Sequence, residues 1–314
     1  MPYFLGIDTS NYTTSASIYD SESDEMLRKK KLLPVRHGEC GLRQSDAVFH
    51  HVQQLHEIIH ELFDGFDGNI EAIAASERPR DAEGSYMPCF TVGYNTARVL
   101  SDVLKIPLYS FSHQCGHIAA ALYSSGMTEL VDKEFLAFHV SGGTTEAVLV
   151  KPDRERIFNV TLAASTLDLN AGQLIDRIGV MLGLDFPCGA ALEQLAAKNK
   201  EILKAKPTLK GEDCCLSGIE NICRKAYEKT SSKEYVSALC LEYVEKTVEE
   251  MCEKLLKKYG TMPVVFAGGV MSDSIIKNKL SGRFDSYFAQ PEFSADNASG
   301  TAFLCWLRHR ISNE

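Results

Sequence analysis

The pattern of apolar and polar positions predicts alternating strands and amphipathic helices in the first part of the chain. Apolar residues at Val48, Val52, Leu55, Ile59 and Leu62 recur at helical spacing and predict a helix over 45–63. Short apolar runs bounded by turn-forming residues predict strands. The pattern thus predicts one strand that ends at Asp8 and further strands over 13–19, 26–33, 70–75 and 107–111. It predicts helices over 45–63, 92–104 and 113–123.

The second part of the chain repeats this order. It predicts strands over 135–140, 147–150, 156–162, 264–267 and 286–288, and helices over 169–182, 190–198, 215–227, 235–258, 274–280 and 298–309. Three strands, a helix, a strand and a helix occurring twice indicate an internal duplication. We therefore predict an α/β protein with an N-terminal lobe over 1–124 and a C-terminal lobe over 134–314, with a helical insertion at about 185–260. Two facing lobes would place their turns on one cleft, where open α/β sheets bind ligands.

Charge argues against a general attraction for nucleic acid. The 314 residues include 33 basic and 42 acidic side chains, so the net charge is −9. Any RNA contact must therefore come from a local basic patch or from a partner. The densest basic run is 28–31, in a predicted strand, where such a run is usually a solvated edge.

Cysteine usage and hydropathy predict a cytoplasmic protein. The ten cysteines contain no C-x-x-C pair, which is typical of a reducing compartment rather than a disulfide framework. The chain opens without a basic and then apolar leader, and it has no apolar run of 18 residues. We expect neither export nor membrane insertion.

A glycine turn between two apolar strands is the strongest candidate for ligand binding. The stretch FLAFHVSGGTTEAVLV, over 135–150, predicts two strands joined by a tight Ser-Gly-Gly turn. Glycine lets backbone N–H groups face an anion and lets a ligand approach the main chain. We predict a nucleotide or phosphate site here, and an ordinary hairpin is the alternative.

Two histidines four residues apart are candidate metal ligands. His113 and His117 would lie on one helical face, within reach of one ion. A two-His, one-acid site needs a carboxylate, and Asp296 at the start of the last predicted helix could supply it, although an N-cap role is equally open. Such a ligand set would suit one divalent ion, Fe or Zn.

A second histidine pair matches a peptidase motif. His56, Glu57 and His60 form the H-E-x-x-H pattern, in which the glutamate is the general base for a zinc-bound water. The same helix already carries two further histidines. His56 and His60 flank its apolar stripe, which fits the edge of an ordinary amphipathic helix instead. A metallopeptidase is therefore a further alternative.

A third glycine-bearing loop follows a buried strand in PVVFAGGVMSD. The paired glycines Gly268 and Gly269 let a ribose or a flat ring approach the backbone, and Asp273 could accept from hydroxyl groups. Asp176 and Gly189 would lie at the rim of the same site. Together with the turn after Asp8, these loops could surround a nucleotide.

Taken jointly, these motifs resemble the tRNA threonylcarbamoyladenosine synthase family, once catalogued as sialoglycoprotein endopeptidases. The resemblance covers nearly the whole chain and rests on segments in the family's order: GIDTSNYTTS, the H-x-x-x-H helix, VSGGTT, LIDRIGVMLGLDFPCG, LSGIENI, FAGGVMSD and ADNASG. It implies the two-lobed, duplicated RNase H-like fold of the superfamily of sugar kinases, heat-shock chaperones and actin.

The resemblance also implies an activity, a set of site residues and partners. The family transfers a threonylcarbamoyl group from threonylcarbamoyl adenylate to N6 of the adenosine adjacent to the tRNA anticodon. It implies that His113, His117 and Asp296 bind the metal ion. It implies a paralogous protein subunit and an ATPase as partners, and no catalytic side chain is assigned. The implied substrate-binding residues are His139, Val140, Ser141, Gly142, Gly143, Asp176, Gly189 and Asp273.

The chain departs from the family pattern at several positions. Cys115 stands where the family usually has Glu, Thr144 where it has His, and Asp273 where it has Asn. ERPRDAEGSYMP replaces a loop rich in glycine and proline. A nucleotide-binding, non-catalytic paralogue that acts as a scaffold is therefore an alternative, and a small-molecule kinase is another.

Overall fold

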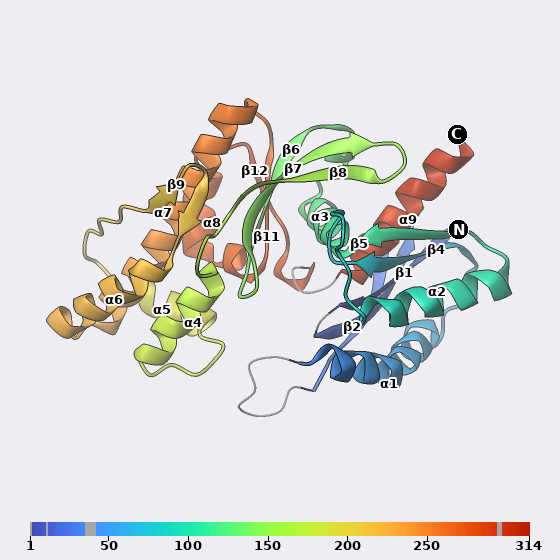
Figure 1. Cartoon of the computed structure of the whole chain (residues 1–314), viewed down its shortest axis with the longest axis horizontal. Coiled ribbons are helices and arrows are strands. Elements are labelled where there is room, and N and C mark those ends of the chain that lie inside the picture. The colour runs from blue at the N-terminus through green and yellow to red at the C-terminus, as the bar shows by residue number, and fades with distance from the viewer. Residues whose placement is uncertain (1, 11, 35–41, 294–296) are drawn as a thin grey trace. The chain divides into compact units, whose positions relative to one another are not determined.

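The computed structural model describes residues 2–10, 12–34, 42–293 and 297–314. The chain forms two compact units (Figure 1). Unit 1 consists of Met1–Val131, Pro152–Asn159 and Glu292–Glu314, and unit 2 of Asp132–Lys151 and Val160–Pro291. Each unit is described by itself below.

Unit 1 is built on a five-stranded sheet in the order β3-β2-β1-β4-β5. β1 is antiparallel to β2 and parallel to β4, β2 is antiparallel to β3, and β4 is parallel to β5. β1 and β2 are buried along almost their whole length, since helices cover the sheet. The strands are β1 (Tyr3–Ser10), β2 (Thr13–Asp20), β3 (Glu25–Leu32), β4 (Ile70–Arg78) and β5 (Leu108–Ser112).

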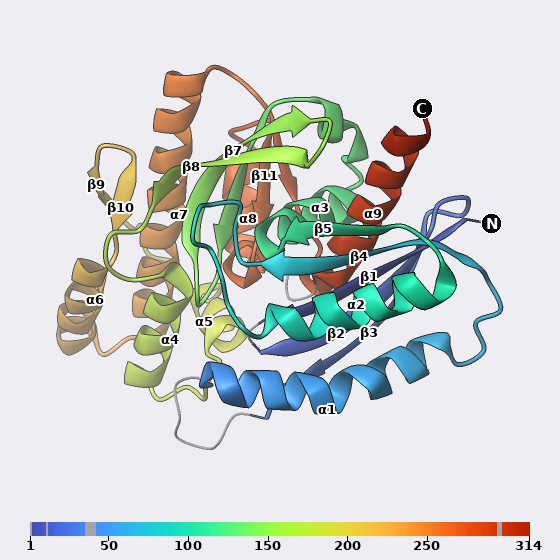
Figure 2. The same ribbon diagram turned by 45° about the vertical axis from the view of Figure 1, so that its right-hand side comes forward.

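Helices lie on both faces of this sheet (Figure 2). α1 (Gln44–Phe63) and α2 (Phe90–Leu104) cover one face, and α3 (His113–Ser125) and α9 (Ala298–Asn313) cover the other. The apolar stripe predicted for the first helix is confirmed in part, because Leu55 and Leu62 join the core and Ile59 packs against it. Val52 is exposed, and Ile58, which the prediction did not include, is buried instead.

Glycines allow α9 to approach its neighbours very closely. A Cβ atom added to Gly6 of β1 would lie 2.3 Å from the backbone oxygen of Ala298. A Cβ atom at Gly300 of α9 would lie 1.9 Å from the backbone oxygen of Gly116 in α3. Backbone therefore packs against backbone here, and no other residue type fits at these positions without movement.

Unit 2 is built on a second sheet of five strands in the order β12-β11-β6-β7-β8. β6 is antiparallel to β7 and parallel to β11, which is parallel to β12. The strands are β6 (Phe135–Val140), β7 (Thr145–Asp153), β8 (Ile157–Ser165), β11 (Val264–Ala267) and β12 (Ser286–Phe288). The turn between β7 and β8 belongs to unit 1.

The two sheets have the same topology, which confirms the predicted duplication. In each sheet the first strand in the chain is central, the second and third extend it on one side, and the fourth and fifth extend it on the other side in parallel. The predicted elements match the observed ones within a few residues at their ends. Alternation of apolar and polar positions was therefore sufficient to find them.

The helices of unit 2 enclose the larger hydrophobic core of the chain. Long α7 supplies many of its buried side chains and contacts α5, α6 and α8. The helices are α4 (Ala171–Met181), α5 (Gly189–Ala196), α6 (Ser217–Thr230), α7 (Lys233–Tyr259) and α8 (Ser274–Ser281). A short hairpin of β9 (Thr208–Lys210) and β10 (Asp213–Cys215) also lies in the insertion, which was predicted as helices alone.

Two further differences from the prediction concern α9 and the short helices. The prediction placed α9 in the C-terminal lobe, but it packs on β1, β2 and β4 and belongs to unit 1. Close packing explains this placement, because α9 lies against the backbone at Gly6 of β1 and Gly116 of α3, and both glycines belong to unit 1. The 3-10 helices η1 (Thr128–Asp132), η2 (Gly269–Ser272) and η3 (Pro291–Phe293) were not predicted.

Within the described residues, no helix combines the length and the apolar character that crossing a membrane requires.

Candidate active site

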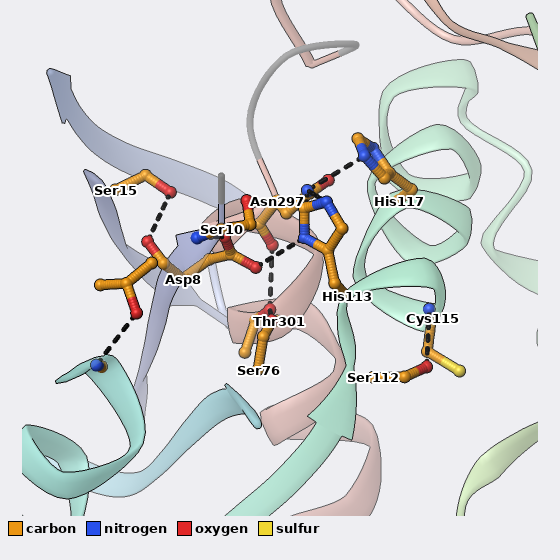
Figure 3. A network of polar contacts seen from close by, with 12 residues as sticks. Asp8, Ser10, Ser15, Ser76, Ser112, His113, Cys115, His117, Asn297 and Thr301 are labelled. Carbon is orange, nitrogen blue, oxygen red and sulfur yellow. Dashed lines mark hydrogen bonds and ion pairs between the residues drawn. The ribbon is translucent and has the colours of Figure 1, made fainter. Parts of the chain in front are cut away.

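The end of β1 carries a buried carboxylate that contacts the first candidate metal ligand. Asp8 is 1% exposed, and its Oδ2 atom lies 2.9 Å from Nδ1 of His113 (Figure 3). The Ser10 amide donates to Oδ1 at 2.9 Å. Burial raises the pKa of the Asp8 carboxyl, but the charge and hydrogen bond of His113, with further hydrogen bonds, outweigh it and lower the pKa to about 2. Asp8 is therefore ionised and keeps the Nδ1 proton on His113.

The two candidate imidazoles lie together at the start of α3. Ser112 caps this helix by accepting from the Cys115 amide, so His113 occupies the first helical position and His117 the same face one turn later. Their ring centroids are 4.6 Å apart. The prediction that His113 and His117 converge is confirmed by this geometry.

Asn297, directly before α9, lies between the two rings. Its Nδ2 atom is 2.9 Å from Nε2 of His113 and 3.1 Å from Nε2 of His117 (Figure 3). Its Oδ1 atom is buried and has no hydrogen-bond partner among the described residues. Close packing of α9 at Gly116 and Gly300 holds Asn297 at this distance.

The third predicted ligand, Asp296, lies outside the described residues. Among the residues that are described, no group of three or more His, Cys, Asp or Glu side chains is placed to hold a metal ion. The structure therefore brings together two imidazoles, an amide and a supporting carboxylate, and the three-ligand site stays a prediction.

The sequence analysis did not assign Asp8, Asn297 or Asp81 to this cluster. Asp81 comes from the loop between β4 and α2, and its Oδ2 atom accepts from Ser112 Oγ at 3.0 Å and from Cys115 Sγ at 3.1 Å. The Gln114 amide donates to the backbone oxygen of Pro79 in the same loop. This loop is thus fastened to the first turn of the helix that carries both imidazoles.

The H-E-x-x-H residues do not form a comparable cluster. His56, Glu57 and His60 are exposed on α1, and Glu57 pairs with Lys31 Nζ at 2.7 Å. No described group of potential ligands gathers around them. A solvated helix edge accounts for the motif.

A pocket of about 310 Å³ in unit 2 brings together four of the predicted substrate-binding residues. They come from the Ser-Gly-Gly turn, α4, the start of α5 and the loop before α8. The pocket is lined by Gly142, Gly172, Ile175, Asp176, Pro187, Gly189, Ala190, Glu193, Gly269, Val270, Ser272 and Asp273. The predicted residues His139, Val140, Ser141 and Gly143 are not among the lining residues.

The Ser-Gly-Gly turn is a tight hairpin, as predicted, and Gly142 is open on its outer side. A Cβ atom at Gly142 or Gly143 would meet no atom within 4 Å. The amides of Gly143 and Thr144 donate to Ser141 Oγ at 3.3 and 3.1 Å. These two N–H groups are thus satisfied inside the turn, whereas the prediction had turn amides facing an anion.

His139 and Val140, at the end of β6, lie against the loop after β11. Gly268 has a φ of +97°, and a Cβ atom there would lie 2.3 Å from the Val140 oxygen and 2.8 Å from Cδ2 of His139. Only glycine fits this turn without strain. The close approach brings η2 and the Ser-Gly-Gly turn to one side of the sheet.

Asp176 fixes the loop on the opposite wall. Its Oδ1 atom accepts from the Cys188 amide at 2.8 Å, one residue before Gly189 begins α5. Gly179 of α4 packs against Cys188 with no space for a side chain. Asp176 thus both lines the pocket and shapes it.

Asp273 is a half-buried acid at the N-terminus of α8. It caps this helix by accepting from the amides of Ile275 and Ile276 at 2.9 and 3.0 Å. Burial, with the charge of Glu193, raises the pKa of Asp273 to about 6 despite these hydrogen bonds. Ionised Asp273 is therefore destabilised in the folded protein.

We expect Asp273→Asn to stabilise the protein at neutral pH. Because the pKa of Asp273 is higher in the folded protein, its neutral form contributes stability. This contribution is complete below about pH 3.8 and is lost as the pH rises through about 6. Asparagine keeps the cap but cannot ionise. The free energy of unfolding should rise by about 1 to 2 kcal/mol at pH 7.5, allowing for solvent screening, and the gain should shrink towards pH 4. Urea unfolding at several pH values measures this.

Asp168→Asn is the matched control. Burial raises the pKa of Asp168, but hydrogen bonds from Ser217, Leu216 and Leu169 outweigh it, so the net shift is downward. This variant should lose stability at neutral pH. A gain for Asp273→Asn that does not change with pH would contradict the role assigned to its charge.

Comparison with known proteins adds to this geometry. The family model of tRNA N6-adenosine threonylcarbamoyltransferase matches residues 36–303. A protein of that name from Archaeoglobus fulgidus is 25% identical over 99% of the chain and 92% of its own length. Another from Sulfurihydrogenibium sp. is 28% identical over 98% of the chain and 90% of its own length.

A longer relative is the probable bifunctional tRNA threonylcarbamoyladenosine biosynthesis protein of Methanocaldococcus jannaschii, 27% identical over 98% of the chain. The chain spans 55% of that protein, so about half of the bifunctional relative has no counterpart in the match.

Solved structures confirm the fold class. Full-length HypF in its phosphate- and nucleotide-bound form has a TM-score of 0.59 at 15% identity, with 99% of the chain and 56% of that chain covered. Component A of (R)-2-hydroxyglutaryl-CoA dehydratase from Acidaminococcus fermentans has a TM-score of 0.56 at 15% identity, with 99% and 100% covered. The chain has the duplicated, two-lobed fold of the superfamily of sugar kinases, heat-shock chaperones and actin, as predicted.

Proposed function

Because the chain belongs to the tRNA N6-adenosine threonylcarbamoyltransferase family, we propose that it transfers the threonylcarbamoyl group of threonylcarbamoyl adenylate to N6 of the adenosine adjacent to the tRNA anticodon. The observation that carries this proposal is the pocket of unit 2. Segments far apart in the sequence bring Gly142, Asp176, Gly189 and Asp273 to its wall. The open glycine positions leave room for a ribose or an adenine ring against the backbone.

The carboxylates of the pocket suit the hydroxyl groups of the adenylate better than its phosphate. Asp176, Glu193 and Asp273 all line the pocket, and carboxylates accept hydrogen bonds from ribose hydroxyls. A phosphate beside them would be repelled, and this includes Asp273, because a pKa of about 6 leaves its carboxyl mostly ionised at neutral pH. The adenylate would therefore bind with its ribose towards these acids.

The His113 cluster has the chemistry of a metal site. Two imidazole Nε2 atoms lie within 3.1 Å of Nδ2 of Asn297, whose Oδ1 atom is buried and has no partner in the part of the chain that the structure describes. His113, His117 and the predicted ligand Asp296 would hold one divalent ion, Fe or Zn. When bound, the ion would act as a Lewis acid that polarises the carbamoyl group. Asp8 would orient His113 by keeping its Nδ1 protonated.

Partner proteins are part of this proposal. The bifunctional relative is about twice as long as the matched region, which supports a second protein acting with this chain. By the family resemblance, this would be an ATPase, together with a paralogous subunit. The proposed place of action is the cytoplasm.

The direct test is transfer of labelled threonylcarbamoyl to unmodified tRNA, with release of AMP. The purified chain is incubated with threonylcarbamoyl adenylate and tRNA, alone and with its partner proteins. Asp176→Ala should lower the transfer rate at least about tenfold, because the variant loses both a pocket wall and the loop anchor. Asp213→Ala is the control, since Asp213 also accepts one backbone amide at 2.8 Å, from Ser165, but does not line the pocket.

Wild-type protein that binds the adenylate but transfers nothing, with partners present, would favour the non-catalytic paralogue. Equal transfer by Asp176→Ala and Asp213→Ala would remove the pocket from the proposal.

A further inference from the structure

Five lysines follow one another closely in the segment from the end of α5 through β9, and we call them the lysine ladder. Lys198, Lys200, Lys204, Lys206 and Lys210 lie within 13 residues that contain a single acid, Glu201. All five are exposed. Their charge is concentrated locally in a chain whose net charge is −9.

The basic run of β3 lacks such free charge. Arg28 pairs with Glu292 at 2.9 Å, Lys31 with Glu57 at 2.7 Å, and Lys29 with Glu61 at 3.6 Å. By contrast, among the described ion pairs none includes a lysine of the ladder. The strand with the densest run of basic residues is therefore largely neutralised, and the ladder is not.

Apolar residues of the same segment fix the direction of the ladder. Leu203, Ala205 and Leu209 pack against the core of unit 2. Lys204, Lys206 and Lys210 alternate with them and are exposed. An extended chain rises about 3.3 Å per residue, so side chains two residues apart stand roughly 6.6 Å apart on one face. This is comparable to the separation of successive phosphates along a nucleic acid strand.

The groove beside the ladder is mixed in charge. It is lined by Pro207, Lys246, Lys254, Lys257 and Arg283, and also by Glu249, Glu250 and Glu253. Figure 1 shows β9 beside α7, and contacts between the two elements agree. Lys246 and Arg283 pair with Glu249, and Lys254 pairs with Glu250. The groove is therefore largely neutralised, and by the described ion pairs the unpaired positive charge on this side lies mainly on the ladder itself.

The ladder is connected to the pocket by one short helix. Gly189, Ala190 and Glu193 of α5 line the pocket, and α5 ends at Ala196, two residues before Lys198. Eight helical residues span about 12 Å at 1.5 Å per residue. A phosphate backbone on the ladder would lie a few nucleotides from an adenosine that approaches an adenylate bound in the pocket.

We propose that the lysine ladder binds the phosphate backbone of the tRNA substrate and holds it beside the pocket. This inference rests on the proposed function, since it assigns a surface to its substrate. Lysines act as point charges on phosphates, so they fix position and leave sequence selection to other contacts.

The test compares two triple variants of the full chain that each remove three lysines. K204Q/K206Q/K210Q removes part of the ladder, and K29Q/K30Q/K31Q removes the basic run of β3. Binding of unmodified tRNA is measured by fluorescence anisotropy at a series of salt concentrations. The ladder variant should bind at least about tenfold more weakly at low salt, and the slope of log K against log salt should fall by roughly 2. The β3 variant should stay within twofold of wild type.

Two outcomes would overturn the proposal. They are an unchanged affinity of the ladder variant and an equal loss in both variants. AMP release from threonylcarbamoyl adenylate is measured in parallel. If wild type transfers the group and the ladder variant binds tRNA as tightly as wild type, only the role of the ladder is refuted. If wild type neither binds tRNA nor transfers the group, the proposed function is refuted as well. Thermal melting of both variants tests whether they remain folded.

Discussion

Gly300→Ala is expected to destabilise the protein by at least about 3 kcal/mol. The added methyl group would lie 1.9 Å from the Gly116 oxygen and 2.7 Å from the Ala120 nitrogen, both of which are backbone atoms of α3. Neither atom can turn away as a side chain would, so α3 and α9 must separate. Chemical unfolding monitored by circular dichroism measures the loss. The same displacement should move Asn297 away from the two imidazoles.

Gly218→Ala serves as the control for this prediction. Gly218 also lies in a helix, α6, but a Cβ atom there would meet nothing within 4 Å. Alanine should leave the stability unchanged or raise it by up to about 1 kcal/mol, because glycine is a poor helix former. Similar losses for both variants would show that helix propensity, and not contact between α3 and α9, controls the result.

His117→Ala should remove bound metal and lower threonylcarbamoyl transfer at least about 100-fold. Changes to outer partners of metal ligands typically cost 10–100-fold, and loss of a ligand should cost more. Asp8→Asn, which changes only the partner of His113 Nδ1, should therefore fall between His117→Ala and wild type. Metal content of the purified proteins and the transfer rate are measured side by side.

His56→Ala is the matched control, since His56 is exposed on α1 and lies in the rejected peptidase motif. It should leave metal content and transfer unchanged. Equal metal content in wild type and His117→Ala would rule out the proposed ligand pair.

The regular elements of the fold could be predicted from the sequence because burial imposes a period on it. Strands such as β11 and helices such as α1 show the apolar runs and spacings that their packing requires. The hairpin of β9 and β10 was missed because its strands have three residues each, too short for a period to appear. The placement of α9 was missed because chain order does not reveal backbone contacts between distant glycines.

The candidate site was predictable where residues are close in sequence. His113 and His117 stand one helical turn apart, so their convergence follows from helix geometry. The contact of Asp8 with His113 joins a strand end and a helix start that are 105 residues apart, and no local pattern encodes it.

Cys115 shows how a departure from the family pattern can be understood only in three dimensions. The family usually has Glu at this position. In the structure, the Asp81 carboxylate reaches Cys115 Sγ at 3.1 Å, and Arg78 holds Asp81 at 2.6 Å. Arg78, the last residue of β4, and Asp81 both lie in the segment ERPRDAEGSYMP, which also departs from the family pattern. A carboxylate is thus present near the first turn of α3, although it comes from another segment.

The position of α9 in unit 1 has a consequence for biosynthesis. The ribosome makes residues 1–131 first and residues 292–314 only after nearly all of unit 2. Until then β1 and α3 lack the helix that covers them, and their apolar surfaces stay open to solvent or to chaperones. Unit 2 can complete its core earlier, although its residues come later in the chain. Nascent unit 1 is therefore incomplete until α9 has been made, and Asn297 reaches the two imidazoles only then.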